Sequence, residues 1–135
     1  MKKKLIALSL AVLMMAALFT GCGESAQGFY RIKTINGKSV FDHLVEANPN
    51  RTLTEWDIQQ VLLQMSIDSL DDYITLDLQE NHVCVGNGAF KTLAYGTWEQ
   101  SGDSVTMGQL HGTLQNGELL IKAQGYTYVL TRTEQ

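Results

Sequence analysis

Residues 99–132 read EQSGDSVTMGQLHGTLQNGELLIKAQGYTYVLTR, and they carry the clearest secondary-structure pattern of the chain. Short runs in which apolar and polar residues alternate are separated by glycine-containing turns at residues 101–103, 115–117 and 124–125. Alternation with a period of two is typical of half-buried strands, and an Asn-Gly pair is a strong hairpin signal. The stretch therefore predicts consecutive antiparallel strands joined by tight turns.

The same pattern extends toward the N-terminus, where a strand at residues 29–35 precedes Asn36-Gly37. The remaining expected strands span residues 73–78, 82–85, 90–100, 104–108, 110–114, 118–123 and 126–132, with residues 86–88 expected to break the chain. About eight short strands with regular turn signals predict a mainly β fold, an antiparallel meander curled into a half-barrel or small barrel.

A helical insertion is expected at about residues 39–66. Residues 39–47 predict a short helix, and Thr52-Leu53-Thr54-Glu55 has the spacing of a capping box at the start of a second helix. An apolar stripe with helical spacing follows, formed by Ile58, Val61, Leu62 and Met65. We expect this stripe to pack on the sheet, over the face of residues 94, 96 and 98, because an apolar stripe must be buried somewhere. The alternatives are a cavity beside the small residues at 94 and 96, and a helix that binds a partner.

The first 21 residues predict an export signal. Lys2, Lys3 and Lys4 precede an apolar run over residues 5–19. This run is shorter than the about 20 residues needed to span a bilayer, and it matches the apolar core of a secretory signal. We therefore expect residues 1–21 to be removed.

Cys22 follows this leader in the context Leu18-Phe19-Thr20-Gly21-Cys22, which resembles the lipobox of bacterial lipoproteins. The resemblance implies that Cys22 is lipidated, that residues 22–28 form a tether, and that the protein faces the extracytoplasmic side of a bacterial cell membrane. A plain secretory signal beside an incidental cysteine is the alternative, as is a retained anchor helix.

Charge and cysteine content exclude several classes of protein. The 135-residue chain has 10 basic and 14 acidic residues, and loss of the three leader lysines leaves 7 against 14, a net charge of -7. Such an acidic domain lacks the basic face of a nucleic-acid binder, and its membrane contact must come from lipid. With Cys22 lipidated, Cys84 has no partner for an intramolecular disulfide, so the domain at residues 29–135 depends on its own core.

Residues 96–107, 116–121 and 128–132 resemble the lipocalin-like domains of small bacterial lipoproteins. The match rests on a G-x-W pattern at residues 96–98, on glycine turns between strands, and on an aromatic-rich last strand that ends in Thr-Arg. It covers about residues 73–133 and implies a β-meander architecture. The G-x-W of lipocalins proper lies on the first strand, whereas here it falls in the middle of the meander.

Aromatic residues supply the candidate binding face. Tyr126 and Tyr128 are expected to share one sheet face, with Tyr95 and Trp98 as further candidates for it. Such rings either stack on a sugar or line a pocket, and the alternative is that they only cover the sheet.

Metal chemistry is not predicted. His82 and Cys84 stand two residues apart and, with His43 or His111, supply soft ligands, but two ligands do not make a site. The acidic run Asp68, Asp71 and Asp72 lacks the spacing of a calcium loop, and we interpret it as a solvated segment that blocks edge pairing.

The serines offer no nucleophile motif, and residues 86–88 lack the lysine of a phosphate loop. We therefore expect no enzyme activity and no cofactor. The leading hypothesis is a lipid-anchored, non-enzymatic binding or interaction domain of the cell envelope, with an envelope protein as its partner. The alternative is a carrier of a small apolar ligand or sugar inside the barrel.

Overall fold

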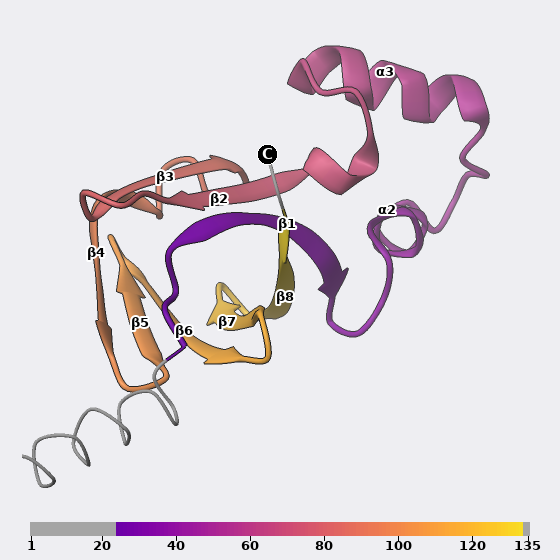
Figure 1. Ribbon diagram of the computed structural model, residues 1–135. Coiled ribbons are helices and arrows are strands. Elements are labelled where there is room, and N and C mark those ends of the chain that lie inside the picture. The colour runs from indigo at the N-terminus through magenta and orange to yellow at the C-terminus, as the bar shows by residue number, and fades with distance from the viewer. Residues whose placement is uncertain (1–23, 134–135) are drawn as a thin grey trace, which may run out of the picture.

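The computed structural model describes residues 24–133, so the predicted leader, Cys22, Gly23 and the last two residues lie outside the described part. Each of eight antiparallel strands pairs with the next along the chain, and the last pairs with the first to close a barrel (Figure 1). The strands are β1 (Gly28–Ile35), β2 (Ile74–Leu78), β3 (Val83–Gly88), β4 (Tyr95–Ser101), β5 (Ser104–Met107), β6 (Leu110–Gln115), β7 (Glu118–Ala123) and β8 (Tyr126–Thr133). The predicted meander is confirmed: it is a small closed antiparallel barrel, which is compatible with a lipocalin-like fold.

Closure depends on strands from the two ends of the domain. Ile32 of β1 pairs with Leu130 of β8, and an irregularity between Ile32 and Thr34 shifts the register of this pair. Because the barrel closes, its sheet has no free edge. The interpretation of the acidic run at residues 68–72 as an edge blocker is therefore wrong, and Asp72 instead forms an ion pair with Arg31 at 2.7 Å.

Side chains fill the barrel interior. The alternation that predicted the strands places every second residue inside, as in β7, where Leu119 and Ile121 are fully buried and Leu120 is exposed. The largest fully buried side chains are Tyr30, Phe90, Ile35, Ile74, Leu76, Leu78, Met107, Leu119, Ile121, Leu130, Val105 and Cys84. The barrel therefore has a packed core.

A helical arm lies between β1 and β2. It consists of α2 (Val40–Ala47), α3 (Glu55–Met65) and a 3₁₀ turn, η1 (Leu70–Asp72). Helix α2 packs on the barrel through buried Val40 and through Leu44, which contacts the core. Among the described residues, no helix has the length and apolar character needed to cross a membrane.

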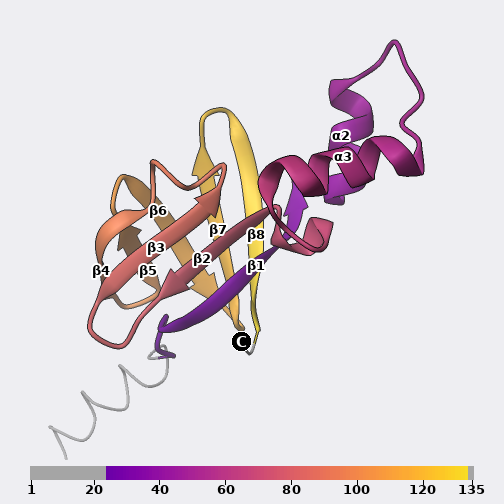
Figure 2. The same ribbon diagram turned by 90° about the horizontal axis from the view of Figure 1, so that it is seen from above.

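Helix α3 does not cover the sheet, so that expectation is wrong. None of its residues is buried, and the positions meant to receive its stripe, Ala94 and Trp98, are buried in the core of the closed barrel. Figures 1 and 2 show α3 projecting beside the barrel next to α2. Two residues of the apolar stripe, Ile58 and Val61, instead line a groove between the two helices together with Leu44 of α2.

The capping box of α3 lies two residues later than predicted. The Thr54 hydroxyl accepts a hydrogen bond from the Asp57 backbone N–H at 3.2 Å, and the Asp57 carboxylate accepts one from the Thr54 N–H at 2.8 Å. The shorter Asp fills the role expected of Glu55, because Thr54 is the residue with the extended backbone that a helix N-cap requires.

The segment before β4 is a turn rather than the start of a strand. Strand β3 continues through residues 86–88, whereas residues 89–94 fold back with Ala94 N–H donating to the Phe90 carbonyl at 2.9 Å. Gly86 permits this close return, because a Cβ at its position would lie 2.6 Å from the Phe90 carbonyl oxygen. The turn places the fully buried Phe90 ring in the core.

The two ends of the barrel differ. We call one end the floor: it carries the start of β1, the turns at residues 79–82, 102–103 and 116–117, and the end of β8. The other end, the upper end, joins the helical arm. Figure 2 shows the arm extending from the upper end, whereas β8 ends at the floor.

Candidate functional site

The four predicted aromatic residues do not form one face. Trp98 is buried in the core, and its indole N–H donates to the Gln79 carbonyl at 2.8 Å. Tyr95 is 52% exposed and pairs across the strands with Val85, which is also exposed. Tyr128 is buried and Tyr126 is 41% exposed, with 6.0 Å between their ring centroids. The structure thus brings Tyr126 and Tyr128 together and places Tyr95 and Trp98 elsewhere.

Rings close the upper end of the barrel. The Tyr128 ring meets Phe90 edge-on at 4.9 Å, and Tyr126 meets His43 of α2 edge-on at 5.5 Å. Burial raises the pKa of Tyr128, with smaller contributions from Tyr126 and Tyr73. These contacts join the arm to the barrel. The two tyrosines therefore pack against neighbouring side chains, as in the predicted alternative in which the rings only cover the sheet.

His82 and Cys84 do not share a strand face, because His82 lies in the turn before β3 with a left-handed backbone (φ 68°). Its ring stacks on Trp98 at 4.6 Å. Cys84 points into the core, and burial raises its pKa to about 11. The described residues contain no group of three metal-ligating side chains.

A groove runs between the end of α3 and the first three strands. It has a volume of about 660 Å³, and its walls include Phe29, Met65, Asp68 and Lys91. The Arg31–Asp72 ion pair also lies in this wall. The groove is lined by charged and apolar side chains alike and lies outside the barrel.

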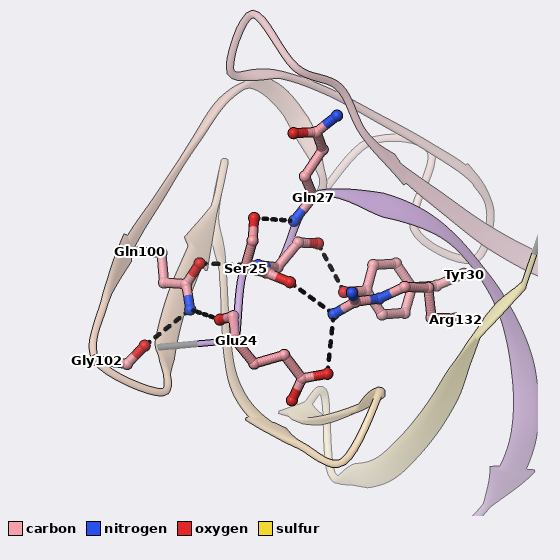
Figure 3. A network of polar contacts seen from close by, with 8 residues as sticks. Glu24, Ser25, Gln27, Tyr30, Gln100, Gly102 and Arg132 are labelled. Atoms are coloured by element: carbon pink, nitrogen blue, oxygen red, sulfur yellow. Dashed lines mark hydrogen bonds and ion pairs between the residues drawn. The ribbon is translucent and has the colours of Figure 1, made fainter. Parts of the chain in front are cut away.

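A polar network at the floor holds the chain just before β1 (Figure 3). Both backbone groups of Ala26 are bonded: its N–H donates to Gln100 Oε1 at 2.8 Å, and its carbonyl accepts from the Tyr30 hydroxyl at 2.6 Å. Gln100 Nε2 also donates to the Glu24 carbonyl at 2.7 Å and to the Gly102 carbonyl at 2.8 Å. One side chain therefore ties the segment to the turn between β4 and β5.

Arg132, near the end of β8, completes this network. Its Nη2 donates to the Ser25 carbonyl at 2.6 Å and lies 3.3 Å from the Glu24 carboxylate. The guanidinium also stands over the Tyr30 ring, 5.4 Å from its centroid. Gly28 makes room for this side chain, since a Cβ there would lie 3.0 Å from Arg132 Cδ.

We call residues 24–26 with Tyr30, Gln100 and Arg132 the N-terminal clamp. Ala26 and Tyr30 are fully buried, and burial raises the pKa of Tyr30 although Arg132 opposes the shift. Sequence reasoning treated residues 22–28 as a tether and missed the clamp. The only local sign of the clamp in the sequence is the small Ala26 between polar residues, and this pattern does not indicate that Gln100 or Tyr30 bonds to it.

Apolar side chains are exposed on the arm. Trp56 is 67% and Leu63 is 70% exposed, and their spacing of seven places them on one face of α3. On α2, Phe41 is 42% and Val45 is 39% exposed, at a spacing of four. The largest exposed apolar side chains of the helices therefore lie on surfaces that the barrel does not use.

No known protein family, curated protein or solved structure matches this chain.

Proposed function

We propose that this protein is a lipid-anchored, non-enzymatic domain of the bacterial cell envelope that binds an envelope protein through its outer surface. The observation that carries the proposal is the closed and filled barrel. Leu76, Met107 and Leu130 are each fully buried, so the interior is packed with side chains and a ligand would have to displace them.

The carrier alternative is weaker for the same reason. A pocket for a small ligand has a volume of about 300 Å³ or more. Three grooves among the described residues reach that size, and they lie between the arm and the outside of the barrel, between α2 and α3, and at the turn between β7 and β8. The surface available to a partner includes the arm, where Trp56 and Leu63 are exposed. Aromatic side chains such as that of Trp56 are enriched at protein interfaces.

The lipid anchor is supported by the lipobox-like context of Cys22 and by the place where the described chain begins. Glu24, two residues after Cys22, lies at the floor, where it contacts Gln100 and Arg132 (Figure 3). The arm extends from the opposite end of the barrel (Figure 2). An anchor at Cys22 would thus leave the arm unobstructed for a partner.

Two experiments test the proposal. Cys22→Ala should abolish incorporation of labelled fatty acid and leave the leader uncut, whereas Cys84→Ala, the matched control at the other cysteine, should be processed normally. Normal processing of Cys22→Ala would refute the anchor.

A photo-crosslinking residue at Leu63, on the arm, should yield a specific crosslinked envelope protein in intact cells, whereas the same residue at Glu99, on the barrel wall, should not. The product at Leu63 should disappear in the Trp56→Ala background. Equal products from both positions, together with a small molecule retained by the native protein in mass spectrometry, would favour the carrier instead.

A further inference from the structure

The N-terminal clamp fixes where the anchor leaves the domain. We infer that the barrel stands with its floor against the lipid bilayer and presents the helical arm on the side away from the membrane. This inference rests on the proposed lipidation of Cys22 and goes beyond it by naming the surface that faces the lipid.

The chain between the lipid and the barrel is short. Each residue spans at most about 3.6 Å, so Cys22 lies within about 7 Å of Glu24 along the chain. Glu24 itself is held at the floor, where its carbonyl accepts from Gln100 and its carboxylate pairs with Arg132. The anchored barrel thus has almost no free tether.

The clamp holds backbone groups as well as side chains. Three consecutive carbonyls, those of residues 24, 25 and 26, accept hydrogen bonds from Gln100, Arg132 and Tyr30 respectively. These donors come from three strands, β4, β8 and β1. A segment bonded to three strands moves with the barrel, so the barrel cannot swing freely about residue 26.

The arm extends away from the floor. Strand β8 has eight residues, and a strand of that length tilted as in small barrels has a height of about 20 Å. The arm begins only at the upper end of β1, so it starts about that far from the floor. Figure 2 shows the loop between α2 and α3 on the far side of the arm from the barrel.

The test uses the full lipidated protein in phosphatidylcholine vesicles that contain a lipid with a nitroxide on its headgroup. A fluorophore is attached at Asp103→Cys in a floor turn or at Asn50→Cys in the loop between α2 and α3, both exposed positions. Unmodified protein is the blank for labelling, because Cys84 is buried with a pKa raised to about 11. Contact-range quenching should be at least about twofold greater at Asp103→Cys, given a barrel height of about 20 Å.

A variant with twelve Gly/Ser residues inserted after Gly23 keeps the clamp and lengthens the tether. Such a linker has a mean reach of about 20 Å, so quenching at Asp103→Cys should fall toward that at Asn50→Cys. The clamp variant Gln100→Ala with Tyr30→Phe should also reduce the difference between the two positions.

The outcomes separate the two proposals. If mass spectrometry shows the lipid on Cys22 but both positions are quenched equally, or Asn50→Cys is quenched more, the orientation is refuted and the anchor stands. If no lipid is present on Cys22, both are refuted. A difference between positions that the inserted linker leaves unchanged would show that the short tether does not set the orientation, and would overturn the role of the clamp.

Discussion

Ala26 allows a sharp test of the clamp, because Gln100 and Tyr30 bind the two polar groups of one buried residue. Gln100→Ala leaves the Ala26 N–H without its acceptor, and Tyr30→Phe leaves the Ala26 carbonyl without its donor. An unsatisfied buried backbone group costs about 1–3 kcal/mol. Each single substitution should therefore lower the free energy of unfolding by about that amount.

The double variant should cost less than the sum of the two single variants. Once the segment around Ala26 detaches, water reaches both of its backbone groups, so the second substitution removes little more. Contacting residues that act on one element show coupling of about 0.5–3 kcal/mol. We expect the double variant to be more stable than additivity predicts by at least about 0.5 kcal/mol.

Urea unfolding followed by tryptophan fluorescence measures these changes. Trp98 is 4% exposed and reports on the core, whereas Trp56 is 67% exposed, so a Trp56→Phe background isolates the signal of Trp98. The matched controls are Tyr126→Phe, at a partly exposed tyrosine, and Gln115→Ala, at an exposed glutamine, and each should change stability by no more than about 0.5 kcal/mol.

Additive losses at Tyr30 and Gln100 would refute the argument that one segment joins them. Losses no larger than those of the two controls would refute the clamp itself. Either result would also remove the structural basis for a fixed orientation at the membrane.

Three further predictions concern the core, the cap of α3 and the turn before β4. The Cys84 thiol, with a pKa raised to about 11, should resist maleimide at pH 8 in the folded protein and react on unfolding, and rapid reaction of the folded protein would contradict its burial. The stabilisation from the buried neutral thiol is complete below the unfolded pKa near 9 and should be lost as the pH rises toward 11. Thr54→Ala should lower the stability of α3 by about 1 kcal/mol, measured as faster amide hydrogen exchange in Glu55–Met65. The unfolding of the barrel should change little, because α3 has no buried residue. An equal effect of Thr52→Ala would contradict the observed cap. Phe90→Ala should destabilise the barrel by about 3–5 kcal/mol in urea unfolding, because the Phe90 ring is fully buried in the core. An equal loss of stability from Phe41→Ala, at an exposed position on α2, would contradict this role of Phe90 in the core.

The meander was predictable because its signals are local. Residues 118–123 and 126–132 alternate on either side of Gln124-Gly125, and the observed strands have those bounds to within one residue. The turn at residues 89–94 was not predictable from alternation, because Phe90 and Ala94 fit a strand as well as they fit a buried turn. What decides between the two is the close approach of Phe90 to Gly86, which is a tertiary contact.

The helical stripe shows a different limit of sequence reasoning. Ile58 and Val61 predicted a helix, which is observed as α3, but periodicity does not say which surface receives the stripe. The sheet was unavailable to them because closure of the barrel buried residues 94 and 98 in the core. A meander that stayed open would have left that face for the helix to cover.

The clamp was missed because its partners are remote in sequence. Gln100 binds the backbone of residues 24 and 26, which precede it by 76 and 74 positions. Backbone acceptors leave no trace in side-chain identity, so neither residue type nor spacing indicates the contact. The sequence predicts an anchor cysteine from the pattern of residues 1–22, whereas only the structure reveals what holds the chain at residues 24–26.

Electrostatics alone would not bring the floor to a membrane. Glu80 and Asp103 are exposed in floor turns, and the charges of Glu24 and Arg132 at the floor offset each other as an ion pair. Lys38, Lys91 and Lys122 lie toward the upper end. Each charge near an anionic bilayer is worth about 1 kcal/mol, so two floor carboxylates oppose contact by about 2 kcal/mol. Burial of acyl chains contributes about 0.8 kcal/mol per CH₂, so the chains on a lipidated Cys22 would outweigh this repulsion many times over. The acidic floor therefore does not contradict a membrane-facing position, but it predicts that Cys22→Ala protein, once its leader is absent, will not bind phosphatidylglycerol vesicles at low salt. Binding of that protein to such vesicles would show that a surface other than the anchor contacts lipid.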